Sequence, residues 1–238
     1  YPPLLDFMTN SSFTISSWFF IDPSNSGTLY RRGDGWSMSQ NRFININQDL
    51  NTIIFSIRST GNSSAQFPGC NYVSESQTTS LVSLEINDPG WYYLSCIRNF
   101  NQELIIQIDS IFESSDDNSG PFDFIESCSC CGDEWVSEGI PNHLIGASRG
   151  EENGNWLNNN HFVGMINNLQ IWNTVLTSDE IENYKSCPPS GNEEGLVGYW
   201  NFNDNEGDTV YDITGNGNHG TINGQASFST DVPENNCE

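Results

Sequence analysis

Short runs in which apolar and polar residues alternate recur along almost the whole chain, and this pattern most constrains the fold. Phe13, Ile15, Phe19 and Ile21 illustrate it, with the period of a strand that buries one face. Stretches rich in Gly, Pro, Asn, Asp and Ser separate the runs and favour turns. The pattern predicts an all-β domain whose further strands fall within 28–32, 36–39, 42–47, 52–58, 81–86, 91–99, 103–112, 143–147 and 161–173.

One segment has the signature of a helix instead. Thr177-Ser178-Asp179-Glu180 is a capping box, in which the Thr hydroxyl accepts from an end N–H and the Glu reaches back. The following residues suit a helix as far as Pro188-Pro189, which cannot continue one. The sequence therefore predicts one short helix over 178–186 among many strands.

The charge of the chain restricts its partners. It has 31 acidic residues against 7 basic ones, a net charge of -24, which would repel nucleic acid and anionic lipid. Seven tryptophans and 12% aromatic residues argue against disorder. No apolar run is long enough to span a membrane, and YPPLLDFMTN lacks the features of a signal peptide. We expect a secreted or cell-surface protein, with no nucleic acid partner and no membrane insertion.

The 7 cysteines fit an oxidising compartment, with disulfides and one thiol left over. The CSCC run at 128–131 could hold zinc with His143, but its spacing is not a standard zinc pattern. Cys187 and Cys237 bracket the segment 195–225, so we expect them to pair and to close the segment 187–238. Five cysteines have no predictable pairing: Cys70, Cys96, Cys128, Cys130 and Cys131.

The segment 195–225 carries the most distinctive motif. Leu196, Gly198, Trp200 and Phe202 alternate with other residues, which predicts an interior strand over 196–203. An acidic, Asn-rich loop and a second short strand at 209–212 follow. The run TGNGNHG then supplies residues that adopt the positive φ angles of tight turns.

This motif resembles the opening of laminin-G-like domains in the concanavalin-like superfamily. The stretches FTISSWFFIDPSNSGTLYRRGDGWSM, PGWYYLSCIRNFNQELIIQIDS and FVGMINNLQIWNTVLTSDEI are similar to other strands of that family and to its final helix. The resemblance implies an all-β fold, a concanavalin-like jelly-roll β-sandwich of two antiparallel sheets with one short helix. The run CPP…GLVGYWNF…STDVP…C also resembles secreted, multi-domain surface proteins of Bacteroidetes, particularly type IX secretion cargo. That likeness implies further domains in the same large polypeptide.

The position of the motif bears on domain count, because the family places it at the start of the domain. Here it stands near the end, at 195–225. Too few residues follow Gln225 to form a second core, and the ends of a sandwich often lie close together. We expect residues 1–238 to form a single domain whose last strands take the usual place of the first.

The resemblance also implies a structural calcium ion where the acidic loop meets the end of the final long strand. Calcium prefers six to eight oxygen ligands, and Asn167 stands where the family usually has Asp. The alternative is that these side chains only cap their own turns. The expected ligands are Asn203, Asp204, Asp208, Asp212, Asn167 and Asn168.

A sugar-binding surface would need an exposed aromatic ring beside planar polar side chains. Trp156 is the leading candidate because polar residues surround it in the sequence. For each tryptophan, packing as a loop anchor is the alternative. The expected ligand-binding residues are Trp156, Asn153, Asn155, Arg149 and Trp135.

The sequence contains no recognisable catalytic site. A glycan hydrolase needs two carboxylates flanking the bond, and the nearest approach, Asp123 and Glu126, has Pro121 where a first Glu would stand. The sequence therefore predicts a non-catalytic, extracellular module for adhesion or for binding a carbohydrate or surface protein. A structural spacer or filament subunit is the main alternative, and a glycan hydrolase is a further one.

Overall fold

The structure is a computed structural model that describes residues 12–32, 43–59, 78–99, 103–116, 143–152, 155–204 and 207–237. The chain divides into two compact units. The first comprises Tyr1–Asp22, Asp88–Ser114 and Gly164–Glu238, and the second comprises Pro23–Asn87 and Ser115–Val163. Within the described ranges, no helix has both the length and the apolar character needed to cross a membrane.

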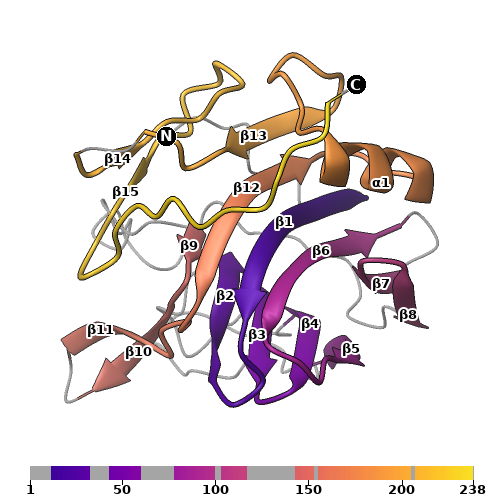
Figure 1. The fold of residues 1–238 in the computed structure, drawn as a ribbon. Helices are drawn as coiled ribbons and strands as arrows, with labels where there is room; N and C mark the ends of the chain where they lie inside the picture. Colours follow the sequence, from indigo (N-terminus) through magenta and orange to yellow (C-terminus); the bar gives the residue numbers. More distant parts are fainter. Residues whose placement is uncertain are drawn as a thin grey trace, which may run out of the picture. The chain divides into compact units, whose positions relative to one another are not determined.

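The first unit is built on a six-stranded sheet with the order β13-β12-β1-β6-β7-β8 (Figure 1). The pairs β12–β13, β1–β12, β1–β6 and β6–β7 are antiparallel. Strand β1 joins distant parts of the chain, because Thr14 pairs with Ile97 on one side and with Trp172 on the other. The strands are β1 (Phe13–Ile21), β6 (Gly90–Arg98), β7 (Glu103–Ile108), β8 (Ile111–Asp116), β12 (Met165–Trp172) and β13 (Leu196–Trp200).

The apolar residues of the alternation in β1 are buried as predicted, but the polar residues Thr14 and Ser16 between them are buried as well, so the strand does not have one buried and one exposed face. Phe13, Ile15, Phe19 and Ile21 are each no more than 2% exposed. The register against β12 shifts between Ser16 and Trp18, as it does where a β-bulge adds one residue to a strand. The periodic core of this strand could therefore be identified from the sequence, but the bulge could not.

The predicted helix is present as α1 (Ser178–Ser186). The Glu180 amide donates to the Thr177 hydroxyl at 3.3 Å, and the Thr177 amide donates to the Glu180 carboxylate at 2.8 Å. These two hydrogen bonds are the expected capping box, which satisfies amides that have no partner inside the helix.

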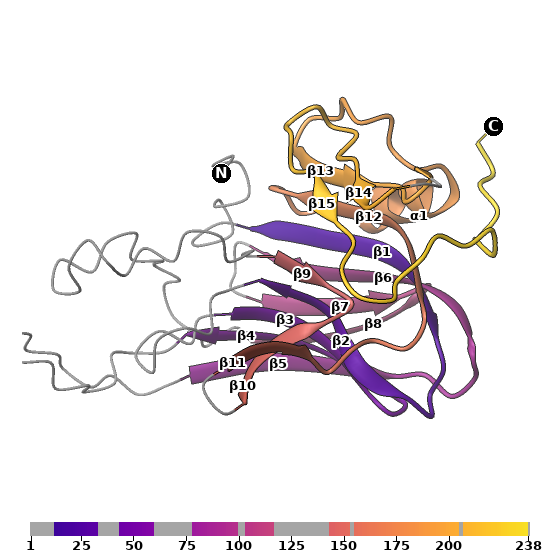
Figure 2. The ribbon, with the colours of Figure 1, turned by 90° about the vertical axis from the view of Figure 1, so that its left-hand side faces the viewer.

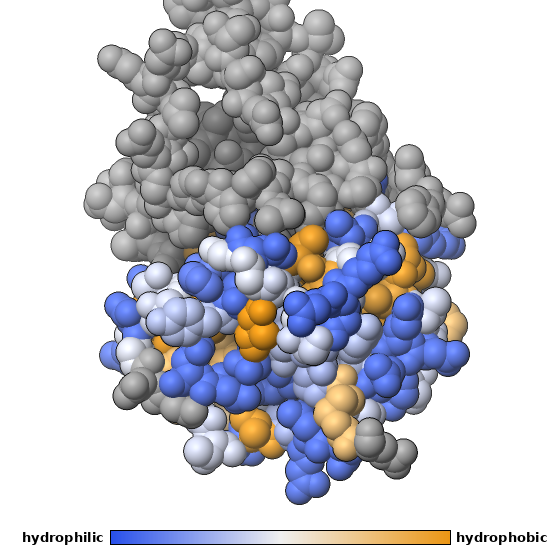
Figure 3. Space-filling view, turned by 90° about the horizontal axis from the view of Figure 1, so that it is seen from above, coloured by the Kyte–Doolittle hydropathy of each residue, from blue (hydrophilic) through white to orange (hydrophobic). Residues whose placement is uncertain are grey.

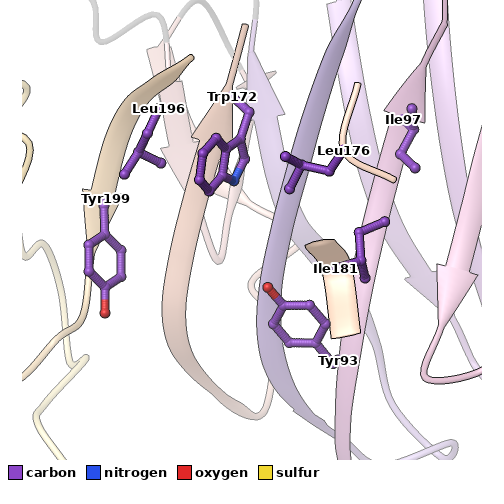
Figure 4. Packing of buried hydrophobic residues seen from close by; sticks show 7 residues of the cluster. All are labelled: Tyr93, Ile97, Trp172, Leu176, Ile181, Leu196 and Tyr199. Atoms are coloured by element: carbon purple, nitrogen blue, oxygen red, sulfur yellow. The ribbon is translucent and has the colours of Figure 1, made fainter. Parts of the chain in front are cut away.

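Helix α1 covers an aromatic and aliphatic cluster on one face of the six-stranded sheet. Ile181 is 2% exposed and is the buried residue of the helix. Figure 4 shows how these side chains gather from β6, β12, β13 and α1. At the end of the helix, Lys185 forms an ion pair with Asp109 at 3.3 Å, next to β7. The cluster consists of Tyr93, Ile97, Trp172, Leu176, Ile181, Leu196 and Tyr199.

The segment 195–225 belongs to the first unit, and its first strand pairs with β12. The strand expected over 196–203 is present as β13, but it ends at Trp200 and lies at an edge of the sheet among the described residues, so the expected interior position is wrong. All five residues of β13 are nevertheless buried. The sequence pattern of such a strand does not tell whether the strand lies at the edge or in the centre of its sheet. Strands β14 (Thr209–Val210) and β15 (Gly220–Thr221) pair with each other and lie near β13, at the opposite edge from β8 (Figures 1 and 2).

A disulfide joins the end of α1 to the C-terminal segment. Cys187 and Cys237, the pair expected from the sequence, are bonded across a separation of 50 residues. Beside the bond, the Asn236 amide donates to the Ser186 carbonyl at 2.8 Å. In the described ranges Cys96 is a free, buried thiol, and burial raises its pKa well above the usual value.

The second unit contains a five-stranded antiparallel sheet with the order β5-β4-β3-β2-β9. Alternate residues of its middle strands, such as Ile44 and Ile46, are buried. A hairpin, β10–β11, follows, and Thr28 forms a parallel bridge with His161 just beyond it. The strands are β2 (Ser26–Arg32), β3 (Phe43–Asp49), β4 (Thr52–Ser59), β5 (Thr78–Glu85), β9 (His143–Ile145), β10 (Ser148–Glu152) and β11 (Asn155–Asn159).

The chain passes between the two large sheets several times. Strand β1 is in one sheet, β2 to β5 are in the other, and β6 to β8 return to the first. The described residues therefore form an all-β jelly-roll fold of two antiparallel sheets with one short helix, which is the fold class predicted from the sequence.

Candidate functional site

The turns around β14 and β15 are organised by the carboxylate of Asp212, which is only 5% exposed. One of its oxygens accepts from the Tyr199 amide at 3.2 Å and from the amide and hydroxyl of Thr214 at 3.0 and 2.7 Å. The other oxygen accepts from the Asn218 amide at 3.0 Å. A carboxylate that accepts several such bonds fixes the path of the backbone around it.

Asn218 connects the same turns to β13. Its side-chain amide donates to the Val197 carbonyl at 2.9 Å, and its own carbonyl accepts from the Trp200 indole at 2.8 Å. Together with Asp212, these bonds explain how the run TGNGNHG, which has little apolar content, is held in one conformation.

Tyr211 and His219 form an aromatic pair at the surface of these turns. Their ring centroids lie 5.2 Å apart, with the rings edge to face. His219 is fixed by the Asp212 amide, which donates to its Nδ1 at 3.0 Å. Tyr211 is 54% exposed, a large fraction for a ring that is held in place.

An open hollow of about 460 Å³ lies beside Tyr211. We call it the acidic hollow, because two carboxylates contribute to its wall. The Tyr211 amide donates to Asp204 at 3.3 Å, and the Thr209 hydroxyl lies 3.4 Å from an oxygen of Asp208. Viewed from the side of β13 and α1, most of the described surface is hydrophilic, with scattered hydrophobic residues (Figure 3). The hollow is lined by Asp204, Gly207, Asp208, Thr209 and Tyr211.

Of the six expected calcium ligands, Asp204 and Asp208 line the hollow. The carboxylate of Asp212 is occupied by the hydrogen bonds described above. Within the described ranges, no group of three or more His, Cys, Asp or Glu residues is placed to hold a metal ion. Calcium binding therefore stays a prediction, for which Asp204 and Asp208 are the available carboxylates.

The three expected ligands with amide side chains are held by protein groups. The Tyr199 hydroxyl donates to the side-chain oxygen of Asn168 at 2.9 Å, and burial raises the pKa of that hydroxyl. Asn167 donates from its side chain to the Asn201 carbonyl at 3.2 Å. The Asn203 amide donates to the Asn201 side chain at 3.0 Å. Asn167 and Asn168 lie on β12 and bond to Tyr199 and Asn201 far away in the sequence, so their side chains do not cap their own turns.

The expected ligand-binding residues are only partly within the described ranges. Trp135 and Asn153 lie outside them. Arg149, Asn155 and Trp156 lie on the β10–β11 hairpin of the second unit, where their backbone partners are Asn158, Glu152 and Glu151. A ligand site at this hairpin stays a prediction.

His143, considered above for zinc, has a different partner. Its Nδ1 lies 2.7 Å from the hydroxyl of Tyr30 in the second unit. Burial, reinforced by the charge of Arg32, lowers the pKa of His143 to about 3, and burial raises the pKa of Tyr30. The pair is a neutral hydrogen bond between β2 and β9.

The residues that sequence reasoning missed are Tyr211 and His219. Both stand within YDITGNGNH, where the glycines and asparagines indicated only turns. An aromatic residue directly before a turn-forming Asp was the available signal, but its exposure depends on how the Asp folds the following loop.

No protein family model matches the chain, and no curated protein matches it. Among solved structures, the Ruminococcus gnavus IT-sialidase CBM40 bound to alpha2,3 sialyllactose shares 14% identity, with a TM-score of 0.48 over 74% of this chain and 83% of that one. The SAP-like pentraxin from Limulus polyphemus shares 12% identity, with a TM-score of 0.44 over 76% and 75% of the two chains. At such low identities and scores, these likenesses carry no argument about ligand or activity.

Proposed function

We propose that the chain is a non-catalytic, extracellular carbohydrate-binding module that holds its ligand at the acidic hollow. The observation that carries this proposal is the exposed Tyr211 ring, which is fixed against His219 beside an open, polar hollow. A ring held in this way can contact the apolar C–H face of a sugar without a large loss of side-chain freedom.

The other lining residues suit the hydroxyl groups of a sugar. The carboxylates of Asp204 and Asp208 accept hydrogen bonds, and the Thr209 hydroxyl both donates and accepts. Binding sites commonly combine an apolar contact surface with a few polar groups that fix the orientation of the ligand. A spacer would have no need of this combination, which is why the binding role is preferred to the structural alternative.

The location outside the cell rests on the Cys187–Cys237 disulfide and on the acidic composition. Membership of the laminin-G-like family, type IX secretion, and further domains in the same polypeptide belong to this proposal as expectations from the sequence. A calcium ion also belongs to it, with Asp204 and Asp208 as the carboxylates that would hold it.

The proposal is tested on a glycan array probed with the wild-type chain, Tyr211→Ala and Phe112→Ala. Phe112 is the matched control, because it is an aromatic residue that is 68% exposed on β8. We expect Tyr211→Ala to weaken binding about tenfold, the equivalent of one good ring contact, and Phe112→Ala to leave it unchanged. Binding that survives Tyr211→Ala, or an array on which no glycan is retained, would overturn the proposal.

Mass spectrometry of the retained glycan after long incubation tests whether the module is non-catalytic, as proposed. We expect the glycan to be recovered intact. Cleavage that is lost when Asp204 or Asp208 is replaced by Asn would show a hydrolase at the same hollow instead.

A further inference from the structure

Two turns in the described ranges contain an asparagine directly followed by a glycine, one on each side of β15 in the sequence. They are Asn216-Gly217 and Asn223-Gly224. An asparagine side chain can react with the backbone nitrogen of the next residue, and glycine obstructs this attack least because it has no Cβ. The two glycines have φ angles of 79° and 78°, and a Cβ built on either would meet no atom within 4 Å. A difference in reactivity therefore depends on how the asparagines are held.

Asn216 is held by both its side chain and its backbone. Its Nδ2 donates to the Val197 carbonyl on β13 at 3.1 Å, and its amide donates to the Thr214 hydroxyl at 3.3 Å. Two residues later, the Asn218 amide donates to the buried Asp212 carboxylate at 3.0 Å. The Asn216 side chain cannot turn toward the next amide unless such bonds break, and breaking them costs free energy.

Asn223 lies in an exposed turn just after β15. Its Nδ2 donates to the Thr221 carbonyl at 3.0 Å, an exposed bond between residues two positions apart. Residues 223–227 are exposed, and among the described residues no hydrogen bond joins 224–228 to another part of the chain. Segments with so few contacts open at little cost in free energy. The Asn223 side chain and the following amide can therefore meet once a single local bond opens.

We propose that Asn223 is a site of spontaneous deamidation and isomerisation, and that the fold protects Asn216 from the same reaction. The Gly224 nitrogen loses its proton to hydroxide and attacks the Asn223 Cγ. The Cγ–Nδ2 bond breaks, and the side-chain nitrogen takes a proton from water and leaves as ammonia. Water then opens the resulting cyclic imide: cleavage at Cγ gives aspartate, and cleavage at the backbone carbonyl gives isoaspartate. The net reaction consumes one water, releases one ammonia and involves no oxidation or reduction.

The reaction changes both the charge and the backbone of this turn. Either product adds a negative charge to a chain whose net charge is -24. Isoaspartate also places one more carbon in the main chain directly after Ile222, whose amide donates to the Asp208 carbonyl at 2.7 Å. The modification therefore alters the connection between β15 and the C-terminal segment that leads to the Cys187–Cys237 disulfide.

Incubation of the folded, oxidised chain in oxygen-labelled water at mildly alkaline pH tests this proposal. Digestion with pepsin and mass spectrometry with electron-based fragmentation then measure conversion at each asparagine and separate the two isomeric products. We expect Asn223 to convert at least about tenfold faster than Asn216, because opening the turn at Asn216 breaks two more hydrogen bonds. Both products should contain labelled oxygen from the water that opens the imide.

The same chain, reduced and unfolded in urea, is the matched control, because the bonds that hold Asn216 are then absent. We expect the two asparagines to convert at similar rates there. In the folded chain, Asn223→Gln should remove the fast conversion and leave the slow conversion of Asn216 unchanged, since the longer side chain would have to close a larger ring.

Equal rates at the two asparagines of the folded chain, or faster conversion at Asn216, would overturn the proposal. A folded chain in which Asn223 stays intact while the unfolded chain reacts would also overturn it, because the turn would then be held as firmly as Asn216. A difference that is just as large in urea would show that the neighbouring sequence controls the rates, and would overturn the protective role of the fold.

Discussion

At the scale of single residues, Asp212 is the position whose role differs most from its expected one. Replacing it with Ala removes an acceptor from the amides of Tyr199, Thr214 and Asn218. We expect a loss of about 3 kcal/mol in the free energy of unfolding, measured by urea denaturation and equal in calcium and in EDTA. Asp208→Ala is the control and should change stability by less than about 0.5 kcal/mol in EDTA. A loss for Asp212→Ala that appears only in calcium would make Asp212 a metal ligand after all.

For the residues around Asp212, the sequence predicted their positions correctly but not their roles. Asp212 and Asn168 were selected because they offer oxygen atoms. Which way such an oxygen points depends on the backbone, and Asn168 has a positive φ of 53° that no local pattern indicated. Tyr211 was missed for the same reason, since its exposure follows from the turn that Asp212 folds.

At the scale of elements, helix α1 allows a test of its own cap. Thr177→Ala removes the hydroxyl that accepts from the Glu180 amide, and we expect a loss of about 1 kcal/mol at neutral pH. The hydrogen bonds from Thr177 lower the pKa of Glu180. The stability that these bonds contribute is therefore fully present above the carboxyl pKa of the unfolded chain. It is lost as the pH falls through the lowered pKa of Glu180 in the folded protein.

Thr177→Ala keeps the bond from the backbone amide to the Glu180 carboxylate but loses the bond that the Thr177 hydroxyl donates to it at 2.8 Å. The difference in unfolding free energy between wild type and Thr177→Ala should therefore shrink in acid, as followed by urea denaturation at a series of pH values. Thr221→Ala, at an exposed threonine of β15, should show no such dependence. A difference that stays constant down to the lowest pH would mean that the Thr177 hydroxyl stabilises the helix only by accepting from the Glu180 amide, and not by donating to the Glu180 carboxylate.

Helix α1 was predictable because its start signal and its stop signal both lie within a dozen residues of sequence. The edge position of β13 was not predictable, because it depends on pairing with β12 and on the lack of a second neighbour among the described strands of the sheet. Alternation reveals that a strand has a buried face, and β13 is buried along its whole length without being central.

At the scale of the whole molecule, the net charge of -24 sets the response to salt. Like charges on a compact chain repel one another and lower its stability. We expect the Tm to rise between 0.01 M and 0.1 M NaCl, as the screening length falls from about 30 Å to about 10 Å. The rise should be smaller when the exposed Asp231 and Glu234 are replaced by Asn and Gln. A Tm that does not change with salt concentration would show that the acidic residues are too far apart to repel one another measurably.

The fold class was predictable at this scale because the repeated alternation over most of the chain leaves few alternatives to an antiparallel β fold. The order of the strands was not, since β1 lies between β6 and β12, and those partners are many residues away. Such pairings are settled by which apolar faces meet, and a linear pattern does not contain that information.

The Cys187–Cys237 bond also determines how the chain would carry a mechanical load. Tension applied at Cys237 crosses the disulfide to Cys187 and passes directly into α1. The backbone between the two cysteines, which includes β13 and the residues that line the acidic hollow, then carries none of this load. Reduction would place its 50 residues in series with the rest of the chain, and full extension would add up to about 170 Å. While the bond is intact, a pull on Cys237 does not load the backbone of β13 or of the loop beside the acidic hollow.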